Sequence, residues 1–180
     1  MSTFGELIYF LFPAASLFLA TSSFCRPKPY VWIPPGWLFG IVWTFLAVTT
    51  GLAGIDVFRI NDLEATSLFF GVCWLLGSGW TVANRFCSQT GNLIYGVLTF
   101  VAVYYLYTSI KNATTGTEKQ RQNGSTLVLP LLAWVGFAVF LYLYSWLGQY
   151  ITAFQITIDE TELKVLDPAL CRQCQLLDKK

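Results

Sequence analysis

Five uninterrupted apolar stretches constrain this chain more than any other feature of its sequence. Each has about the length, ~20 residues, that an α-helix needs to cross the hydrocarbon core of a bilayer. A transmembrane β-barrel would instead alternate apolar and polar residues in segments of about 10 residues. With 55% hydrophobic and 12% charged residues, the sequence predicts an all-α membrane protein, a bundle of five transmembrane helices. The expected spans cover roughly residues 4–24, 36–58, 66–86, 92–110 and 126–150.

Polar residues gather in the gaps between these stretches and after the last one. We expect a transmembrane domain over residues 1–150 and a polar C-terminal tail over residues 151–180. The first stretch lacks a basic leading segment, which favours a retained helix over a cleaved signal peptide. The tail carries Cys171 and Cys174, which are too few thiols to complete a four-ligand zinc site. We expect reduced thiols there, with a redox pair or lipidation as alternatives. The expected connectors are residues 25–35, 59–65, 87–91 and 111–125.

Basic residues are divided unequally between the two sides of the predicted bundle. Because loops rich in Lys and Arg stay in the cytosol, we expect a cytosolic C-terminus and a non-cytosolic N-terminus. Two glycosylation sequons begin at Asn112 and Asn123, in the connector on the non-cytosolic side, where we favour an ordinary polar loop. Seven basic residues share the side of the tail, Arg26, Lys28, Arg85, Lys164, Arg172, Lys179 and Lys180, and four share the other, Arg59, Lys111, Lys119 and Arg121.

The segment WIPPGWLFGIVW, residues 32–43, combines tryptophans with a proline pair and two glycines at the start of the second stretch. Proline has no N–H and a fixed φ, so Pro34 and Pro35 predict a helix start. Gly36 and Gly40 indicate close contact with a neighbouring backbone. Trp43 lies about two turns inside the helix, where its indole N–H needs a partner.

This segment resembles the TspO/MBR family, the translocator proteins also called tryptophan-rich sensory proteins or peripheral-type benzodiazepine receptors. A second block, LPLLAWVGFA over residues 129–138, is similar to the fifth helix of that family. The resemblance covers about residues 1–150 and leaves out the tail. The first block matches the family at Lys28, Pro29, Trp32, Pro34, Pro35, Trp37, Phe39, Gly40, Val42 and Trp43.

Several positions depart from the family pattern. Two residues, Tyr30 and Val31, separate the Lys-Pro pair from Trp32, where the family usually has one. Gly77 stands in place of an Asn in the third helix, Val82 in place of a proline, and Tyr142 in place of the closing Asn of the fifth helix. We therefore expect the aromatic walls of the family's pocket without two of its polar contacts.

Helical spacing places the aromatic residues on common faces. One stripe holds Pro130, Trp134, Phe137, Ala138 and Leu141, and another holds Cys73, Leu76, Gly77, Trp80 and Asn84. Spacing alone favours ordinary helix packing, whereas the resemblance implies a pocket for a planar hydrophobic ligand. The residues predicted to bind this ligand are Trp32, Pro35, Phe39, Trp43, Gly77, Trp80, Trp134, Phe137 and Ala138.

The resemblance implies a receptor or transport role, with porphyrins and sterols such as cholesterol as ligands, and a homodimer. The chain has no histidine, the commonest axial ligand of haem iron, so a metal-free porphyrin suits it better. We expect no required cofactor, no metal site and no nucleic-acid partner. The resemblance also implies a multi-pass protein in the lipid bilayer of the mitochondrial outer membrane or an endomembrane.

The acidic residues argue against ordinary enzymology, because nearly all lie at helix ends, in loops or in the tail. We expect no catalytic residue and no enzymatic activity. Asp56, near the end of the second stretch, is expected to pair with Arg59 three residues later. The alternative function is a structural membrane anchor whose tail docks onto a larger assembly, such as an organellar complex or a virus shell.

Overall fold

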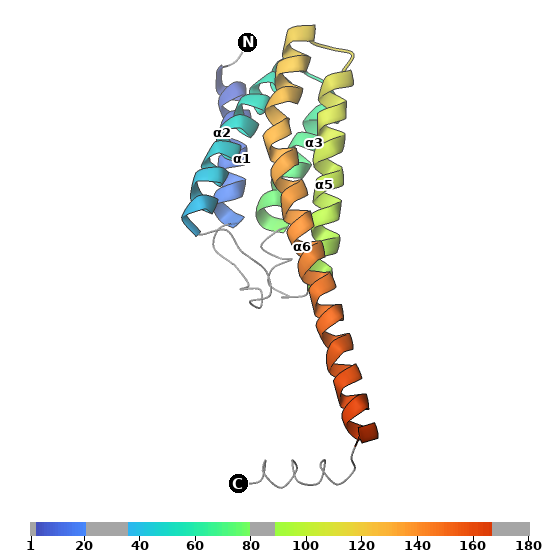
Figure 1. Cartoon of the computed structure of the whole chain (residues 1–180). Coiled ribbons are helices and arrows are strands. Elements are labelled where there is room, and N and C mark those ends of the chain that lie inside the picture. Colours follow the sequence, from blue (N-terminus) through green and yellow to red (C-terminus); the bar gives the residue numbers. More distant parts are fainter. Residues whose placement is uncertain (1–2, 21–35, 80–88, 167–180) are drawn as a thin grey trace.

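The fold is a bundle of helices (Figure 1). The computed structural model describes residues 3–20, 36–79 and 89–166. Within these residues there are five helices and no strand, which confirms the predicted all-α fold class. The helices are α1 (Thr3–Ala20), α2 (Gly36–Ile60), α3 (Leu63–Trp74) with its π-helical continuation η1 (Leu75–Gly79), α5 (Gln89–Asn112) and α6 (Glu118–Leu166).

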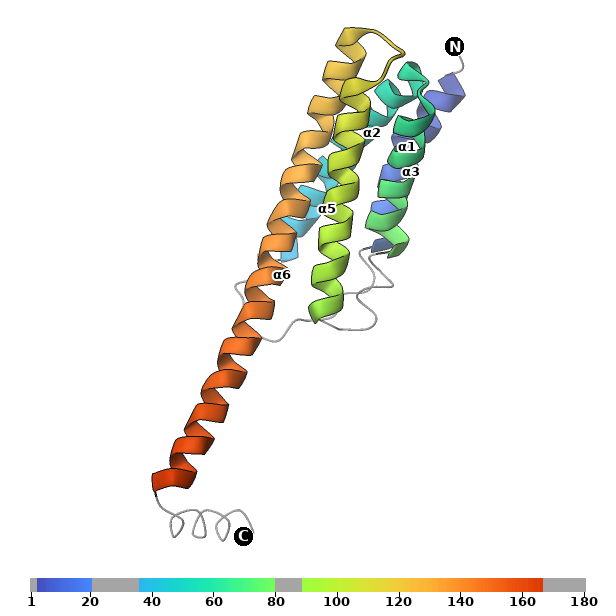
Figure 2. The same cartoon turned by 90° about the vertical axis from the view of Figure 1, so that its right-hand side faces the viewer.

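The five helices close into a ring (Figures 1 and 2). Helix α2 packs between α1 and α6, and α5 packs between α6 and α3. The ring closes where η1 packs against α1, and α3 also contacts α2 across the middle. Neighbours in the ring therefore include pairs far apart in sequence, notably α2 with α6.

Three segments are long and apolar enough to cross a membrane: Trp37–Ile60, Thr90–Asn112 and Glu118–Gly148. The segment Leu63–Gly79 is apolar but shorter, and α1 has 18 residues with Pro13 inside it. Large apolar side chains cover the outer faces of the ring, among them Phe4, Ile41, Leu98 and Phe140. An apolar exterior of this kind suits lipid, so the chain is an integral membrane protein.

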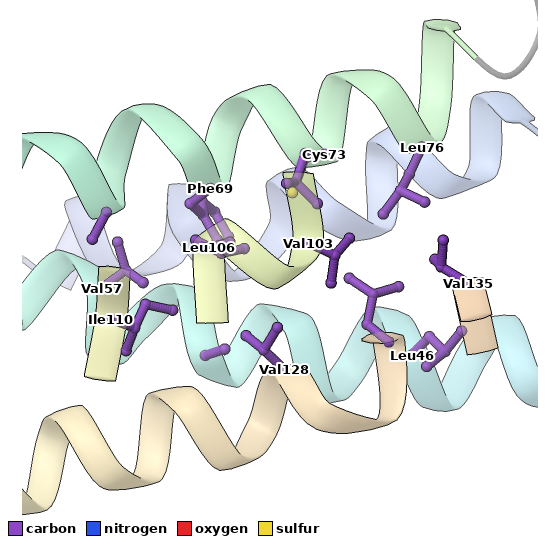
Figure 3. Close-up of a cluster of buried hydrophobic side chains, with 14 of the residues drawn as sticks. Leu46, Val57, Phe69, Cys73, Leu76, Val103, Leu106, Ile110, Val128 and Val135 are labelled. Carbon is purple, nitrogen blue, oxygen red and sulfur yellow. The ribbon is translucent and has the colours of Figure 1, made fainter. Parts of the chain in front are cut away.

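The core runs along the inside of the ring (Figure 3). Phe69 of α3 is fully buried beside Val57 of α2 and Leu106 of α5, and Val128 of α6 completes this part of the cluster. Because lipid tails are as apolar as these side chains, burial inside the ring gains little from water exclusion. Close packing has to hold the helices together instead.

Glycines let α1 lie directly on α2. A Cβ atom on Gly54 would come within 2.6 Å of both the Tyr9 carbonyl oxygen and the Phe69 ring, and one on Gly51 within 2.7 Å of the Phe10 carbonyl oxygen. The close contact predicted at Gly40 is wrong within the described residues, where nothing lies within 4 Å of such an atom. The reason is that Gly40 is exposed on the outer face of α2.

The turn between α2 and α3 is shorter than the connector predicted over residues 59–65. Asn61 adopts a left-handed conformation, with φ of 55°, which Asn tolerates better than most residues. Asp62 then caps α3 by accepting a 3.0 Å hydrogen bond from the Ala65 N–H. Two residues thus reverse the chain.

The connector predicted over residues 111–125 is also too long, because α6 already begins at Glu118. Thr117 and Gln120 form a capping box: the Gln120 side chain accepts from the Thr117 N–H at 2.8 Å, and the Thr117 hydroxyl accepts from the Gln120 N–H at 3.3 Å. The sequon at Asn123 therefore lies in a helix rather than in a loop. The sequon at Asn112 begins at the last residue of α5.

Asp56 and Arg59, both among the described residues, interact electrostatically but do not form the predicted direct ion pair. The Arg59 Nε donates instead to Glu6 Oε1 of α1, at 2.9 Å. Glu6 competes successfully because α1 packs along α2 and presents its carboxylate at the end of the bundle where Arg59 lies. Both partners are partly exposed, so this ion pair adds at most about 1 kcal/mol to stability.

Helix α6 does not end with the apolar part of the fifth predicted span. Its spanning segment ends at Gly148, but the helix continues to Leu166, into the predicted tail. This part projects beyond the other helices (Figure 2). The division of the chain into a domain of residues 1–150 and a tail of residues 151–180 stays a prediction, as does the orientation across the membrane.

Because Gly54 lies against α1, one added methyl group at this position should reduce the stability of the protein. We expect Gly54→Ala to lower the free energy of unfolding by about 1–3 kcal/mol, because the new Cβ would meet the α1 backbone, which cannot move aside like a side chain. Gly40→Ala in the same helix is the control and should be neutral or stabilising, since Ala favours a helix. Unfolding of the purified protein in detergent, followed by circular dichroism, measures both. Equal stability of the two variants would contradict this account of the α1–α2 contact.

Candidate functional site: an aromatic cluster between α2 and α6

Four of the predicted ligand-binding residues meet around one indole. The Trp134 ring of α6 lies 5.7 Å from the Phe39 ring and 6.4 Å from the Trp43 ring, both of α2, measured between centroids. The Phe137 ring is 5.7 Å from Trp134 on the same helix. The two contacts between helices are edge-to-face, at 78° and 79°, an arrangement that aromatic quadrupoles favour.

Spacing along the two helices explains this meeting. Phe39 and Trp43 are four residues apart and so share one face of α2, while Trp134 and Phe137 are three apart on α6. Because α2 packs directly against α6, the two faces come together. We call Phe39, Trp43, Trp134 and Phe137 the aromatic cluster.

The aromatic cluster lies on the end of the hydrophobic core and is only partly covered. Trp43 and Trp134 pack against core residues, and Phe137 keeps 36% of its surface exposed. Leu46 of α2, Leu76 of η1 and Val135 of α6 are buried at one end of the core (Figure 3).

The remaining predicted residues are distributed differently. Ala138 follows Phe137 and is partly buried. Gly77 is buried in η1, where a Cβ atom would clash with the Ser16 carbonyl of α1, so this position serves the contact between α1 and η1. A contact of Gly77 with a ligand stays a prediction. Trp32, Pro35 and Trp80 lie outside the described residues.

The stripe predicted on the third helix is core packing in its described part. Cys73 and Leu76 are 1% and 3% exposed and belong to the hydrophobic core. The stripe on α6 is less buried, since Pro130, Trp134, Ala138 and Leu141 are intermediate and Phe137 is exposed. The aromatic face of α6, rather than that of α3, is therefore the one that a ligand could reach.

Tyr95 of α5 is a positioning residue that the sequence did not single out. Its hydroxyl donates a hydrogen bond to the Leu75 carbonyl at the start of η1. In a π-helix each N–H bonds to the carbonyl five residues earlier rather than four, so the turn is wider than in an α-helix. Such segments often lie at functional sites. The Tyr95 ring also occupies the space beside Gly79, where a side chain would clash. The glycines of the Gly77-Ser78-Gly79 sequence were the available signal for these close approaches.

The chemistry of the aromatic cluster is that of an apolar recognition surface. Its only polar atoms are the two indole N–H groups, which donate but do not accept. Among the residues that the structure describes, no three His, Cys, Asp or Glu side chains gather closely enough to hold a metal ion. Flat apolar surfaces with one or two donors suit planar hydrophobic molecules.

The ring of five helices with an aromatic cluster at one end defines a class of protein, a helical integral membrane protein. The family model for the TspO/MBR family matches residues 11–147. The chain is also 30% identical over 114 residues to the tryptophan-rich protein TspO of Chlorobaculum tepidum, a match that covers 61% of this chain and 68% of that protein. The chain belongs to the TspO/MBR family, as the resemblance in residues 32–43 and 129–138 predicted.

Removing the Tyr95 hydroxyl should loosen the end of α3. We expect Tyr95→Phe to lower the free energy of unfolding by about 1–3 kcal/mol, because the Leu75 carbonyl, left without its donor in an apolar interior, cannot turn to water. Tyr104→Phe, on the 50% exposed Tyr104 of the same helix, is the control and should change little. Thermal unfolding in detergent compares the two. A Tyr95→Phe protein as stable as the control would rule out this role of the hydroxyl.

Proposed function

We propose that this protein is a membrane receptor or translocator that binds planar hydrophobic ligands, porphyrins first and sterols second, against the aromatic cluster. The observation that carries the proposal is the meeting of Phe39, Trp43, Trp134 and Phe137 between α2 and α6. Membership of the TspO/MBR family supports it. We propose a binding protein rather than an enzyme, with no required cofactor.

The proposed binding mode uses the uncovered surface of the rings. A flat macrocycle gains from stacking on indole and phenyl faces, and the partly exposed Phe137 leaves such a face open. The chain has no histidine, so the preferred probe is a porphyrin without iron, which needs no axial ligand. Trp32, Pro35, Trp80, Gly77 and Ala138 complete the proposed binding set.

At two positions this chain lacks an asparagine that the family has, which supports a shift in ligand preference. Gly77 offers no side chain for a hydrogen bond and packs on α1. Tyr142 lies against α5, where a Cβ atom on Gly96 would be 3.3 Å from its ring. We propose that ligands with few polar substituents bind better to this chain than strongly polar ones, because fewer side chains are placed to hydrogen-bond them.

Titration with protoporphyrin IX tests the proposal. We expect Trp134→Ala to weaken binding by about tenfold or more, because Trp134 contacts all three other rings and central aromatic anchors carry much of a binding energy. Porphyrin absorbance should be followed as well as tryptophan fluorescence, since the variant lacks one fluorophore. Trp43→Ala should weaken binding in the same direction.

Trp74→Ala is the matched control, because Trp74 lies on the outer face of α3 and is 58% exposed. It should bind porphyrin as the wild type does. The same affinity in Trp134→Ala, Trp43→Ala and Trp74→Ala would exclude the aromatic cluster as the binding site.

A second candidate function draws on the length of α6. The helix extends from Gly148 to Leu166 beyond the apolar segment, which favours a structural anchor that presents this extension to a larger assembly. Deleting residues 151–180 separates the candidates. A receptor should keep its porphyrin affinity within about twofold after the deletion, because the aromatic cluster lies before Gly148. Loss of porphyrin binding after the deletion would place the extension in the ligand site. A full chain that binds no porphyrin and that loses a co-purifying partner on deletion would favour the anchor.

The remaining proposals concern the assembly and its membrane. We propose a homodimer in the mitochondrial outer membrane or an endomembrane, with a cytosolic C-terminus. The unequal distribution of basic residues supports this orientation, and family membership supports the dimer.

A further inference from the structure

The outer face of α5 is apolar except for two tyrosines near its middle. Helix α5 packs between α6 and α3 and faces the viewer in Figure 2. Its exposed side chains recur at spacings of three and four residues, the pattern of two helices that pack along a common seam. In the part of the chain that the structure describes, nothing covers them. These residues, which we call the α5 face, are 42–59% exposed: Ile94, Val97, Leu98, Val101, Tyr104 and Tyr105.

The two tyrosines lie deep within the spanning segment. Val101 is the middle residue of Thr90–Asn112, and Tyr104 and Tyr105 follow it by about 5 to 6 Å along the helix axis. Because side chains of a helix lean toward its N-terminus, these rings lean back toward the middle of the segment and away from its nearer end. Their hydroxyl groups are therefore placed where water does not reach them.

Neither hydroxyl group forms a hydrogen bond with any residue that the structure describes. The rings of Tyr104 and Tyr105 contact each other edge to face, with their centroids 6.4 Å apart. A threonine on an outer face bonds to its own helix, as Thr44 does by donating to the Gly40 carbonyl at 2.8 Å. A rigid tyrosine ring holds its hydroxyl too far from its own backbone for this. An unpaired hydroxyl among lipid tails is costly, so each of the two needs a partner from outside the chain.

The partner must offer hydrogen-bonding groups at the same depth in the membrane. Acyl chains have none. A second copy of the chain in the same orientation has them, because a two-fold axis along the membrane normal places its tyrosines at the depth of the first pair. A hydroxyl group both donates and accepts, so the α5 face is complementary to itself. Its spacing of three and four residues also suits two parallel helices that pack side by side.

We propose that two copies of this chain meet through the α5 face, with the hydroxyl groups of Tyr104 and Tyr105 hydrogen-bonded across the two-fold axis. Val101 and the other apolar residues of the face pack between the two α5 helices. The proposal rests on the homodimer proposed above and names its surface. It does not depend on porphyrin binding, because the α5 face shares no residue with the aromatic cluster.

The dissociation constant of the dimer tests the proposal. Sedimentation equilibrium of the purified full chain in density-matched detergent measures it. We expect the double variant Tyr104→Phe, Tyr105→Phe to raise the dissociation constant by about tenfold, the effect of losing hydrogen bonds between membrane helices. The unfolding of a single copy should not change, because neither hydroxyl has a partner within the described part of one copy.

Tyr144→Phe is the matched control. Tyr144 is 58% exposed, as Tyr105 is, but it lies on α6 near the end of the spanning segment Glu118–Gly148, where its hydroxyl can reach water. Its removal should leave the dissociation constant unchanged. The α5 face is excluded if the double variant and Tyr144→Phe dissociate at the same concentration.

Cross-linking of tyrosines in the membrane locates the surface independently. Photo-oxidation with a ruthenium complex and persulfate joins neighbouring tyrosine rings, and a denaturing gel then detects only links between two copies. The wild type and Tyr144→Phe should give covalent dimers, and the double variant should lose most of them. Covalent dimers that persist in the double variant would place the contact on another surface and leave the homodimer standing. A chain that is monomeric at every concentration would overturn both the surface and the homodimer, whereas porphyrin titration would still report separately on the aromatic cluster.

Discussion

The close approach of α1 to its neighbours is the constraint on which the rest of the bundle depends. Gly51 and Gly54 of α2 and Gly77 of η1 admit the α1 backbone where any larger residue would collide with a carbonyl group. In lipid, apolar side chains gain little by leaving their surroundings, so the fit between surfaces decides which helices stay together. Once α1 is seated on both α2 and η1, the ring can close through α5 and α6.

The sequence predicted the fold class because the apolar stretches are long and clearly separated. It placed the start of α2 and the extent of α5 well, since composition changes sharply at those points. It failed where polar residues continue a helix. The stretch from Glu118 to Ser125 is too polar to be recognised as part of a span, yet Thr117 and Gln120 cap it as a helix. A search for the Thr-x-x-Gln pattern would have found that start.

Side-chain partners were harder to predict than helices. The three-residue spacing favoured Asp56 as the ion-pair partner of Arg59. Spacing within one helix takes no account of Glu6, which reaches Arg59 from a different helix. Periodicity placed Trp134 and Phe137 on one face correctly, and the resemblance to the TspO/MBR family connected that face with Phe39 and Trp43. Tyr95 escaped notice because its hydrogen bond to Leu75 joins two different helices, α5 and the start of η1. Contacts of this kind depend on which helices become neighbours, and a pattern within one helix does not contain that information.

Helix α6 is continuous over 49 residues, and its geometry has a mechanical consequence. At 1.5 Å per residue, the part after Gly148 reaches about 27 Å past the apolar segment. A rigid rod of that length acts as a lever arm. Tilting the embedded half by ten degrees would sweep the tip at Leu166 sideways by about 5 Å relative to its base. A small change in the tilt of α6 near Trp134 would thereby become a larger displacement at Leu166.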